Sequence, residues 1–482
     1  MKNAPISEMV RRLDTVSTEI LKSLVTIENP ENDTDGVLAW VEGLRKSSIF
    51  EVERVPLASM QGWCFDGNRN LMHNSGKFFS VHGIKVQTNR GGVNQWSQPI
   101  ICQPEVGILG ILCQKRNGVL KFLLQAKMEP GNVNVVQLSP TVQATRSNYT
   151  QVHGGKLPLY LEHFLDLGGK RVVVDQLQSE QGGRFFKKRN RNMVVELPPG
   201  AVIEPHENFV WLTLGQIKRL LSFPNMMNMN TRTVISCIQL RQGGEVAGFL
   251  DFDIGGLTER QRGLLASTLA DENSLFTDEE IISWLTNLKS KTDLNVVPCG
   301  LEEVEGWHVG EWEIAHNEGR FFKVVGIHSR IGGREVAEWS QPLVQPCAEG
   351  IVGFITKMIN DTVHVLVQAK LEAGNFDLLE LAPSVQCITG SYKKLDWAVP
   401  FLDSFLNPRN SKVEFDVNQS EEGGRFFREE NRNMILNVDD SFPNEAGEFF
   451  TWMTLRQVKR FMQFNNYLNV EARCLLANLC PV

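Results

Sequence analysis

The phrase QAKMEPGN at residues 125–132 returns as QAKLEAGN at residues 368–375, and this repetition predicts that the fold itself is duplicated. The match extends outward from the phrase. Over residues 96–149 the chain shares 20 of 54 positions with residues 339–392, without a gap. A self-match of this length indicates a tandem duplication, which has to be recognised before any local motif is interpreted.

The duplication continues after a contraction of two residues. Residues 175–193, DQLQSEQGGRFFKKRNRNM, share 13 of 19 positions with DVNQSEEGGRFFREENRNM in the second half. A chain of 482 residues is too long for one ordinary core, so two domains are the simplest division. We expect a first repeat at 1–238, a glycine-rich linker at 239–262 and a second repeat at 263–482.

The composition is that of an ordinary globular protein, with 42% hydrophobic and 22% charged residues. The net charge is −7, whereas binding to nucleic-acid phosphates needs clustered Lys and Arg. The one basic run, KKR at 187–189, is matched by REE at 428–430 and is interpreted as a solvated turn. No nucleic-acid partner is expected.

Targeting signals and cysteine usage bear on the compartment. The N-terminal stretch has charges where a signal peptide needs an apolar run, and no stretch approaches the roughly 18 uninterrupted apolar residues of a membrane span. The nine cysteines include no CxxC pair, which is typical of free thiols in a reducing compartment. We expect a cytoplasmic protein with no membrane partner.

Each repeat is predicted to be α+β, with a mostly antiparallel sheet flanked by helices. Apolar residues recur at helical spacing over 20–26 and 37–44, and residues 209–223 predict a strand followed by a helix. The Asn117-Gly118 pair predicts a hairpin over 107–127, because both residues tolerate positive φ. A further hairpin is predicted over 182–197, with its polar turn at 187–192.

Several repeated polar residues are candidates for a site. Lys127 and Glu129 share one face of an extended strand, as a surface ion pair or as a functional pair, and their repetition favours the second interpretation. Tyr149 falls on Tyr392 in a chain with only four tyrosines, which fits a shared core contact or a site residue. The two SEQGGRFF-type motifs place Gly-Gly before an arginine, as a structural turn or as a grip on phosphate or carboxylate.

The motifs of several cofactor chemistries are missing from the sequence. It contains no HxxxH or HxH pair, no P-loop, no GxGxxG fingerprint and no GxSxG elbow. We therefore expect no metal site and no cofactor.

The phrase QAKMEPGNVNVVQLSPTVQATRSNYTQVHGG at 125–155, with VQAKLEAGNFDLLELAPSVQCITGSY at 367–392 and SEEGGRFF at 420–427, resembles the NDP-hexose 2,3-dehydratases of deoxysugar pathways. The resemblance covers nearly the whole chain. It implies a TDP-4-keto-6-deoxyglucose 2,3-dehydratase, with two halves that each resemble a Nudix hydrolase domain and that assemble as a homodimer. The Nudix catalytic box itself is not in the sequence.

The implied reaction needs acid–base groups and no redox cofactor. The C4 ketone acidifies the C3 proton, a base removes it, the C2 hydroxyl leaves, and the enol becomes a 3,4-diketo-2,6-dideoxy sugar. We expect Tyr149 and Glu129 to share the acid and base work, with Lys127 lowering the pKa of the tyrosine or stabilising the enolate. The unstable product implies coupling to an NADPH-dependent 3-ketoreductase.

The remaining candidates are polar and aromatic residues near these groups in each repeat. The expected substrate-binding residues of the first repeat are Trp96, Gln98, Gln125, Asn132, Gln143, Thr145, Arg146, Ser147, Asn148, His153, Gly183 and Arg184. The expected residues of a second nucleotide-sugar pocket are Trp339, Gln341, Gln368, Lys370, Glu372, Asn375, Gln386, Tyr392, Gly424 and Arg425. Because Arg146 and His153 have no match in the second repeat, catalysis is expected in the first. The competing hypotheses are a nucleotide-sugar binding protein and a degenerate Nudix hydrolase.

Overall fold

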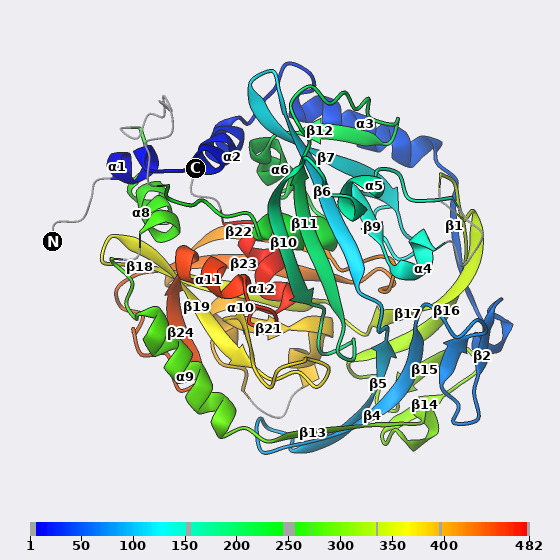
Figure 1. The fold of residues 1–482 in the computed structure, drawn as a ribbon. Coiled ribbons are helices and arrows are strands. Elements are labelled where there is room, and N and C mark those ends of the chain that lie inside the picture. The colour runs from blue at the N-terminus through cyan, green and yellow to red at the C-terminus, as the bar shows by residue number, and fades with distance from the viewer. Residues whose placement is uncertain are drawn as a thin grey trace.

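The computed structural model of the chain describes residues 6–150, 156–243, 256–270, 272–333, 336–394 and 398–479. These residues form an α+β fold with four sheets, shown in Figure 1. Within the described ranges, no helix is long and apolar enough to span a membrane.

Each repeat contains a seven-stranded sheet. The first is formed by β6 (Gly107–Arg116), β7 (Val119–Met128), β8 (Val136–Ser139), β9 (Val142–Ala144), β10 (Arg171–Ser179), β11 (Arg189–Glu196) and β12 (Phe209–Leu212). The second is formed by β18 (Gly350–Ile359), β19 (Thr362–Lys370), β20 (Glu380–Pro383), β21 (Val385–Cys387), β22 (Ser411–Ser420), β23 (Glu430–Val438) and β24 (Phe450–Thr454). The pairing is antiparallel, as predicted, except that β11 runs parallel to β6 and β23 parallel to β18.

The two five-stranded sheets are shared between the repeats. One contains β2 (Trp63–Phe65), β3 (Leu71–His73), β4 (Ser80–Thr88) and β5 (Gln95–Cys102) of the first repeat with β13 (Leu294–Cys299) of the second. The other contains β14 (Trp307–Val309), β15 (Glu313–His316), β16 (Phe322–Ile331) and β17 (Glu338–Pro346) with β1 (Phe50–Val55) of the first. In Figure 1, blue β1 runs beside yellow-green β16, and green β13 beside blue β4. The repeats therefore exchange one strand in each direction.

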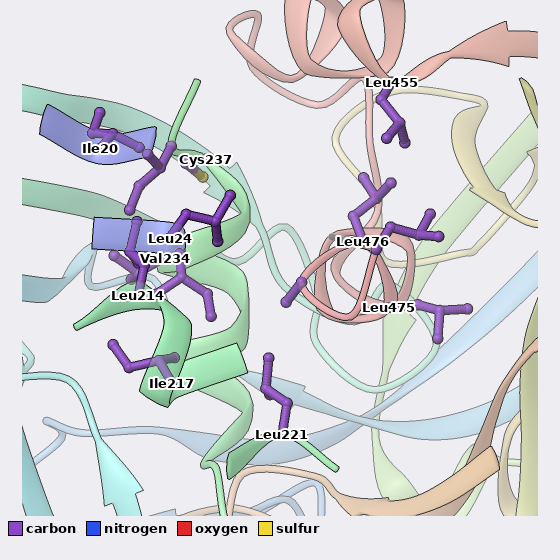
Figure 2. Close-up of a cluster of buried hydrophobic side chains, with 14 of the residues drawn as sticks. Ile20, Leu24, Leu214, Ile217, Leu221, Val234, Cys237, Leu455, Leu475 and Leu476 are labelled. Carbon is purple, nitrogen blue, oxygen red and sulfur yellow. The ribbon is translucent and has the colours of Figure 1, made fainter. Parts of the chain in front are cut away.

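The helices add a second connection between the repeats. They are α1 (Ile6–Arg11), α2 (Thr15–Val25), α3 (Thr34–Ser47), α4 (Arg146–Tyr149), α5 (Glu162–Leu165), α6 (Leu214–Leu220), α7 (Met229–Ser236), α8 (Glu259–Leu269), α9 (Asp278–Ser290), α10 (Leu402–Leu406), α11 (Leu455–Met462) and α12 (Val470–Leu476), with short 3₁₀ turns at Leu57–Ser59, Leu301–Glu303 and Ile388–Lys394. One buried apolar cluster contains side chains from both repeats, among them Ile217, Val234, Leu455 and Leu476 in Figure 2. Because burying a leucine or isoleucine stabilises the fold by about 2 kcal/mol, this cluster binds the repeats together.

Most predicted elements are confirmed, and one hairpin is wrong. The helices over 20–26 and 37–44 lie in α2 and α3, and Asn117 and Gly118 turn between β6 and β7 with φ of 50° and 77°. The hairpin predicted over 182–197 is instead formed by β10 and β11, with residues 180–188 as their loop. These loop residues hydrogen-bond to other parts of the chain, which is why they do not form a strand of their own. Of the predicted linker, residues 244–255 lie outside the described part of the chain, and α8 begins at its end.

Candidate active site

The repeated Lys-Glu pair lies at the end of β7 and is not a surface ion pair. Alternate residues of β7 point to opposite faces, so Ala126 and Met128 pack against the shared apolar cluster while Lys127 and Glu129 face the other way. Lys127 is 7% exposed and Glu129 is 3% exposed. Lys127 Nζ lies 4.0 Å from Glu129 Oε1. The pair is therefore held together away from bulk water, at the wall of a cavity.

The glycine of the repeated phrase is required by a close approach between the repeats. The N–H of Gly131 donates to the carbonyl of Gly423 at 2.8 Å, and the N–H of Arg428 donates to the carbonyl of Gly131 at 2.8 Å. A Cβ on Gly131 would lie 1.6 Å from the carbonyl oxygen of Phe426, which no side chain tolerates. Gly374 meets the loop of the first repeat in the same way. Each phrase thus forms a strand end and a docking point for the other repeat.

The neighbouring asparagine is part of this turn. Asn132 is buried, and its Nδ2 donates to the carbonyls of Lys127 at 3.2 Å and Val135 at 2.9 Å. It shapes the loop on which Glu129 sits, and it does not line the cavity. The expectation that Asn132 binds the substrate is therefore not supported by its contacts.

Because each loop docks on the other repeat, one cavity contains residues that the sequence assigned to two different pockets. A cavity of about 420 Å³ is lined by Lys127 and Glu129 of the first repeat and by Trp339, Gln341, Gly424 and Arg425, which the sequence assigned to the second pocket. We call this space the cavity. The cavity thus brings together residues that the sequence had grouped by repeat, because each Gly-Gly-Arg loop reaches the Lys-Glu strand end of the other repeat.

The counterparts Trp96, Gln98, Gly183 and Arg184 lie with the second Lys-Glu pair. Trp96 Nε1 donates to Gln98 Oε1 at 2.9 Å, and Gln98 Nε2 donates to the carbonyl of Gly183 at 3.0 Å. A Cβ on Gly183 would lie 3.8 Å from Glu372 Oε1. The same contacts recur at the cavity, where Trp339 Nε1 donates to Gln341 Oε1 at 3.1 Å.

Gln143 connects two carboxylates at the cavity. Its Nε2 donates to Glu129 Oε1 at 3.0 Å and to Glu422 Oε1 at 2.8 Å. Glu422 belongs to the second repeat and was not among the sequence candidates. Burial raises the pKa of Glu422, and the charge of Glu129 raises it further.

Two more charged groups at the cavity were missed. Lys188 lies in the KKR run that was interpreted as a solvated turn, yet it is only 5% exposed and its ammonium donates to the carbonyl of Glu105. Burial lowers the pKa of Lys188 to about 8. Glu180 accepts from Asn190 Nδ2 at 2.6 Å, and burial, then the charge of Glu422, raises its pKa to about 7. The basic run itself does not indicate this burial, because Lys187 beside Lys188 is exposed.

The segment after β9 lies at the mouth of the cavity. Thr145 and Asn148 line it, and Asn148 Oδ1 accepts from the Thr145 N–H at 2.9 Å. Ser147 is buried and donates from Oγ to Glu105 Oε2 at 2.7 Å, whereas Arg146 is exposed.

Three other candidates of the first repeat are not placed at the cavity. The side chain of Tyr149 and the whole of His153 lie outside what the structure describes. Gln125 lies on β7, half-buried, and does not line the cavity.

The second cluster surrounds the Lys370–Glu372 strand end and carries different chemistry. Gln386 Nε2 donates to Glu372 Oε1 at 3.0 Å, as Gln143 does in the cavity. Gln181 stands where the cavity has Glu422, and its amide donates to Glu421. Glu429 replaces Lys188, and burial raises its pKa to about 8.

The other candidates of the second repeat are spread around this cluster. Glu471 replaces Asn230, and burial raises its pKa well above the usual value. Gln368 is half-buried on β19, and Asn375 is buried in the turn after Glu372. Tyr392 packs against the core of the second repeat, where burial raises its pKa. Among the described residues, no group of His, Cys, Asp and Glu is arranged to hold a metal ion.

Comparison with known proteins decides the family. A family model described as NDP-hexose 2,3-dehydratase matches residues 34–238 and 278–479. The chain belongs to the NDP-hexose 2,3-dehydratase family. Three curated relatives are each named dTDP-4-dehydro-6-deoxy-alpha-D-glucopyranose 2,3-dehydratase.

These relatives match nearly from end to end. The protein of Saccharopolyspora spinosa is 42% identical over 444 residues, which cover 91% of this chain and 90% of the relative. That of Amycolatopsis orientalis is 41% identical over 466 residues, 95% of this chain and 92% of the relative. That of Streptomyces violaceoruber is 41% identical over 449 residues, 92% of this chain and 96% of the relative.

In this member of the 2,3-dehydratase family, both matched segments build one cavity. Glu129 and Lys188 lie in the first matched segment, and Glu422 and Arg425 lie in the second. Arg425 packs over the ring of Phe79 at 4.1 Å and donates to the carbonyl of Gly424 at 2.7 Å. Residues from both matched segments therefore line the same cavity.

Proposed function

We propose that this chain converts dTDP-4-keto-6-deoxyglucose to dTDP-3,4-diketo-2,6-dideoxyglucose. The relatives that match over more than nine-tenths of the chain carry the name of this activity. The observation that carries the proposal is the buried Lys127–Glu129 pair at the wall of the cavity. A carboxylate beside an ammonium, away from bulk water, is suited to take a proton next to a ketone whose enolate needs a cation.

Glu129 is the base in this proposal, and Lys127 stabilises the charge that develops on the C4 oxygen. Removal of the C3 proton places negative charge on that oxygen, and an ammonium in a site of low dielectric stabilises it more strongly than water does. Tyr149 is the last residue of α4, next to Asn148, which lines the cavity, and its share in the acid–base work remains a prediction.

The nucleotide is held by residues of the second repeat. Arg425 provides a planar cation for a phosphate, and Trp339 provides a ring for the thymine, in place of Arg184 and Trp96. Thr145 and Asn148 supply hydrogen-bonding groups for the sugar at the mouth of the cavity.

Catalysis takes place in the cavity, and the second cluster binds without turnover. The cavity pairs the carboxyl groups of Glu129 and Glu422 with the ammonium groups of Lys127 and Lys188, whereas the second cluster has Glu429 in place of Lys188. A carboxyl group in place of an ammonium does not stabilise the negative charge of an enolate.

The deciding experiment is incubation of the protein with dTDP-4-keto-6-deoxyglucose, with and without EDTA. Dehydration gives an unstable diketone that breaks down and releases free dTDP, with the same rate in EDTA. Substrate returned intact would make the chain a nucleotide-sugar binding protein. Magnesium-dependent release of dTMP would make it a Nudix hydrolase.

Substitution of the two matched tyrosines tests which pocket works. Tyr149→Phe should slow product formation more than Tyr392→Phe. Comparable losses from Tyr392→Phe would remove the preference for the cavity.

The proposal also covers the enzyme that uses the product, the oligomeric state, the compartment and the fold of the repeats. An NADPH-dependent 3-ketoreductase consumes the unstable product, and the protein works as a cytoplasmic homodimer. Each repeat, 1–238 and 263–482, is a Nudix-like unit, which the α+β fold of both repeats supports.

A further inference from the structure

The cavity holds two carboxyl groups side by side, one from each repeat. Gln143 Nε2 donates to Glu129 Oε1 at 3.0 Å and to Glu422 Oε1 at 2.8 Å, so one amide group fixes both. Both side chains line the cavity. When two carboxyl groups are bridged by one amide nitrogen, a negative charge on the first opposes ionisation of the second.

The surroundings decide which group holds the proton. Lys127 Nζ lies 4.0 Å from Glu129 Oε1, and Asn228 Nδ2 donates to Glu129 Oε2 at 3.1 Å. A cation and an N–H donor therefore contact the two oxygens of Glu129, the position from which a base would act. Burial, then the charge of Glu129, raises the pKa of Glu422 and favours its protonated form. Of the two groups, Glu422 is therefore the one suited to hold a proton.

We infer that Glu422 of the second repeat is the general acid that protonates the departing C2 hydroxyl, while Glu129 of the first repeat takes the C3 proton. This inference rests on the proposed function. Glu129 removes the C3 proton, and the electrons of the C–H bond form the enolate. The enolate reforms the C4 ketone, a double bond forms between C2 and C3, and the C2–O bond breaks as Glu422 gives its proton to the oxygen, which leaves as water.

Tautomerisation returns both carboxyl groups to their starting states. The enol loses its O3 proton to the Glu422 carboxylate, and C2 takes the proton held by Glu129. The sum is one sugar converted to a diketone and one water, with no oxidant or reductant. Glu422 thereby joins the acid and base work that the sequence had assigned to Tyr149 and Glu129 together.

The second cluster provides a built-in comparison. Gln181 occupies the position of Glu422 and donates to Glu421, while Glu372 keeps its bond from Gln386. A glutamine amide has no proton to give at neutral pH. The second cluster therefore lacks the acid at this position, although its base position is filled.

Two readouts separate the roles of the carboxyl groups. Exchange of the C3 hydrogen for deuterium in D2O reports proton removal alone, and dTDP release reports the complete dehydration. Glu422→Gln is expected to exchange the C3 hydrogen within about threefold of the wild-type rate and to lose dehydration by 10²-fold or more, in the range of general acid catalysis. Glu129→Gln is expected to lose both.

Controls keep this test independent of folding and of the proposed function. Glutamine is the residue that the first repeat itself has at the position of Glu422, and unchanged dTDP affinity of the variant will show that it is folded. Glu422→Asp should recover part of the dehydration. Glu380→Gln is the matched control, because Glu380 is a buried acid that accepts from Ser179 Oγ at 2.7 Å and does not line the cavity, so both rates should be kept.

Three outcomes contradict the inference. The first is normal dehydration by Glu422→Gln. The second is an equal loss of exchange and dehydration in Glu422→Gln. The third is exchange without dehydration in Tyr149→Phe, while Glu422→Gln retains both rates. Wild-type protein that neither exchanges nor dehydrates would instead overturn the proposed function.

Discussion

The cavity and the second cluster are built from the same motifs, yet they carry different chemistry. Each takes a Lys-Glu strand end from one repeat and a Gly-Gly-Arg loop from the other. They differ at several matched positions, among them Lys188 matched by Glu429, Glu422 matched by Gln181 and Asn230 matched by Glu471. The shared strand ends and loops therefore do not determine the chemistry of a site. It depends on the side chains that differ between the two sites.

The largest expected effect is the difference in kcat between substitutions at Glu129 and at its counterpart Glu372. Glu129→Gln should lower kcat by about a thousandfold, since it removes the base. The counterpart Glu372→Gln should lower kcat by less than about tenfold. Timed formation of free dTDP measures both variants. Equal losses would mean that both pockets turn over substrate.

Lys188 tests the charge difference. Lys188→Glu gives the cavity the residue type of the second cluster and should lower kcat/KM by about a hundredfold, because a carboxylate then opposes the developing enolate. In the wild type, the pKa of Lys188 near 8 should make kcat/KM fall as pH rises above about 8, where the ammonium loses its proton. Lys188→Gln should remove that decline. A decline that persists in the variant would assign it to another group.

The glycines test what the two sites share. Gly131→Ala and Gly374→Ala should each destabilise the protein by about 3 kcal/mol, because a Cβ would meet the carbonyl of Phe426 or Phe185 at 1.6 or 1.9 Å. Calorimetric melting of both variants is the measurement. A loss at only one glycine would show that the two docking loops are not equivalent.

Glu429 should affect stability as a function of pH. Its pKa is about 8 in the folded protein and about 4 in the unfolded chain, so the folded state holds an extra proton between these values. Its contribution to stability is complete below pH 4 and is lost as pH rises to about 8. The melting temperature of the wild type should therefore fall over this range relative to Glu429→Gln. Parallel curves would mean that Glu429 is ionised in the folded protein throughout.

Local patterns predicted the elements well, and long-range contacts limited the prediction of the site. The hairpin at Asn117-Gly118 and the placement of Lys127 and Glu129 on one strand face depend on neighbouring residues, so the sequence reveals them. Glu422, which Gln143 connects to Glu129, belongs to the second repeat. Its position depends on a loop that crosses between the repeats. The burial of Lys188 was missed for a related reason. A basic run does not show which of its lysines is buried by residues far away in the sequence.

The strand exchange constrains how this chain can change during evolution. A duplicated domain is normally a spare copy that can be lost or that can diverge on its own. Here β1 completes a sheet of the second repeat and β13 completes a sheet of the first, so deleting either repeat leaves an unpaired sheet edge in the other. Each repeat also contributes residues to both sites, so neither repeat can be lost without loss of the other's sheet and of both sites.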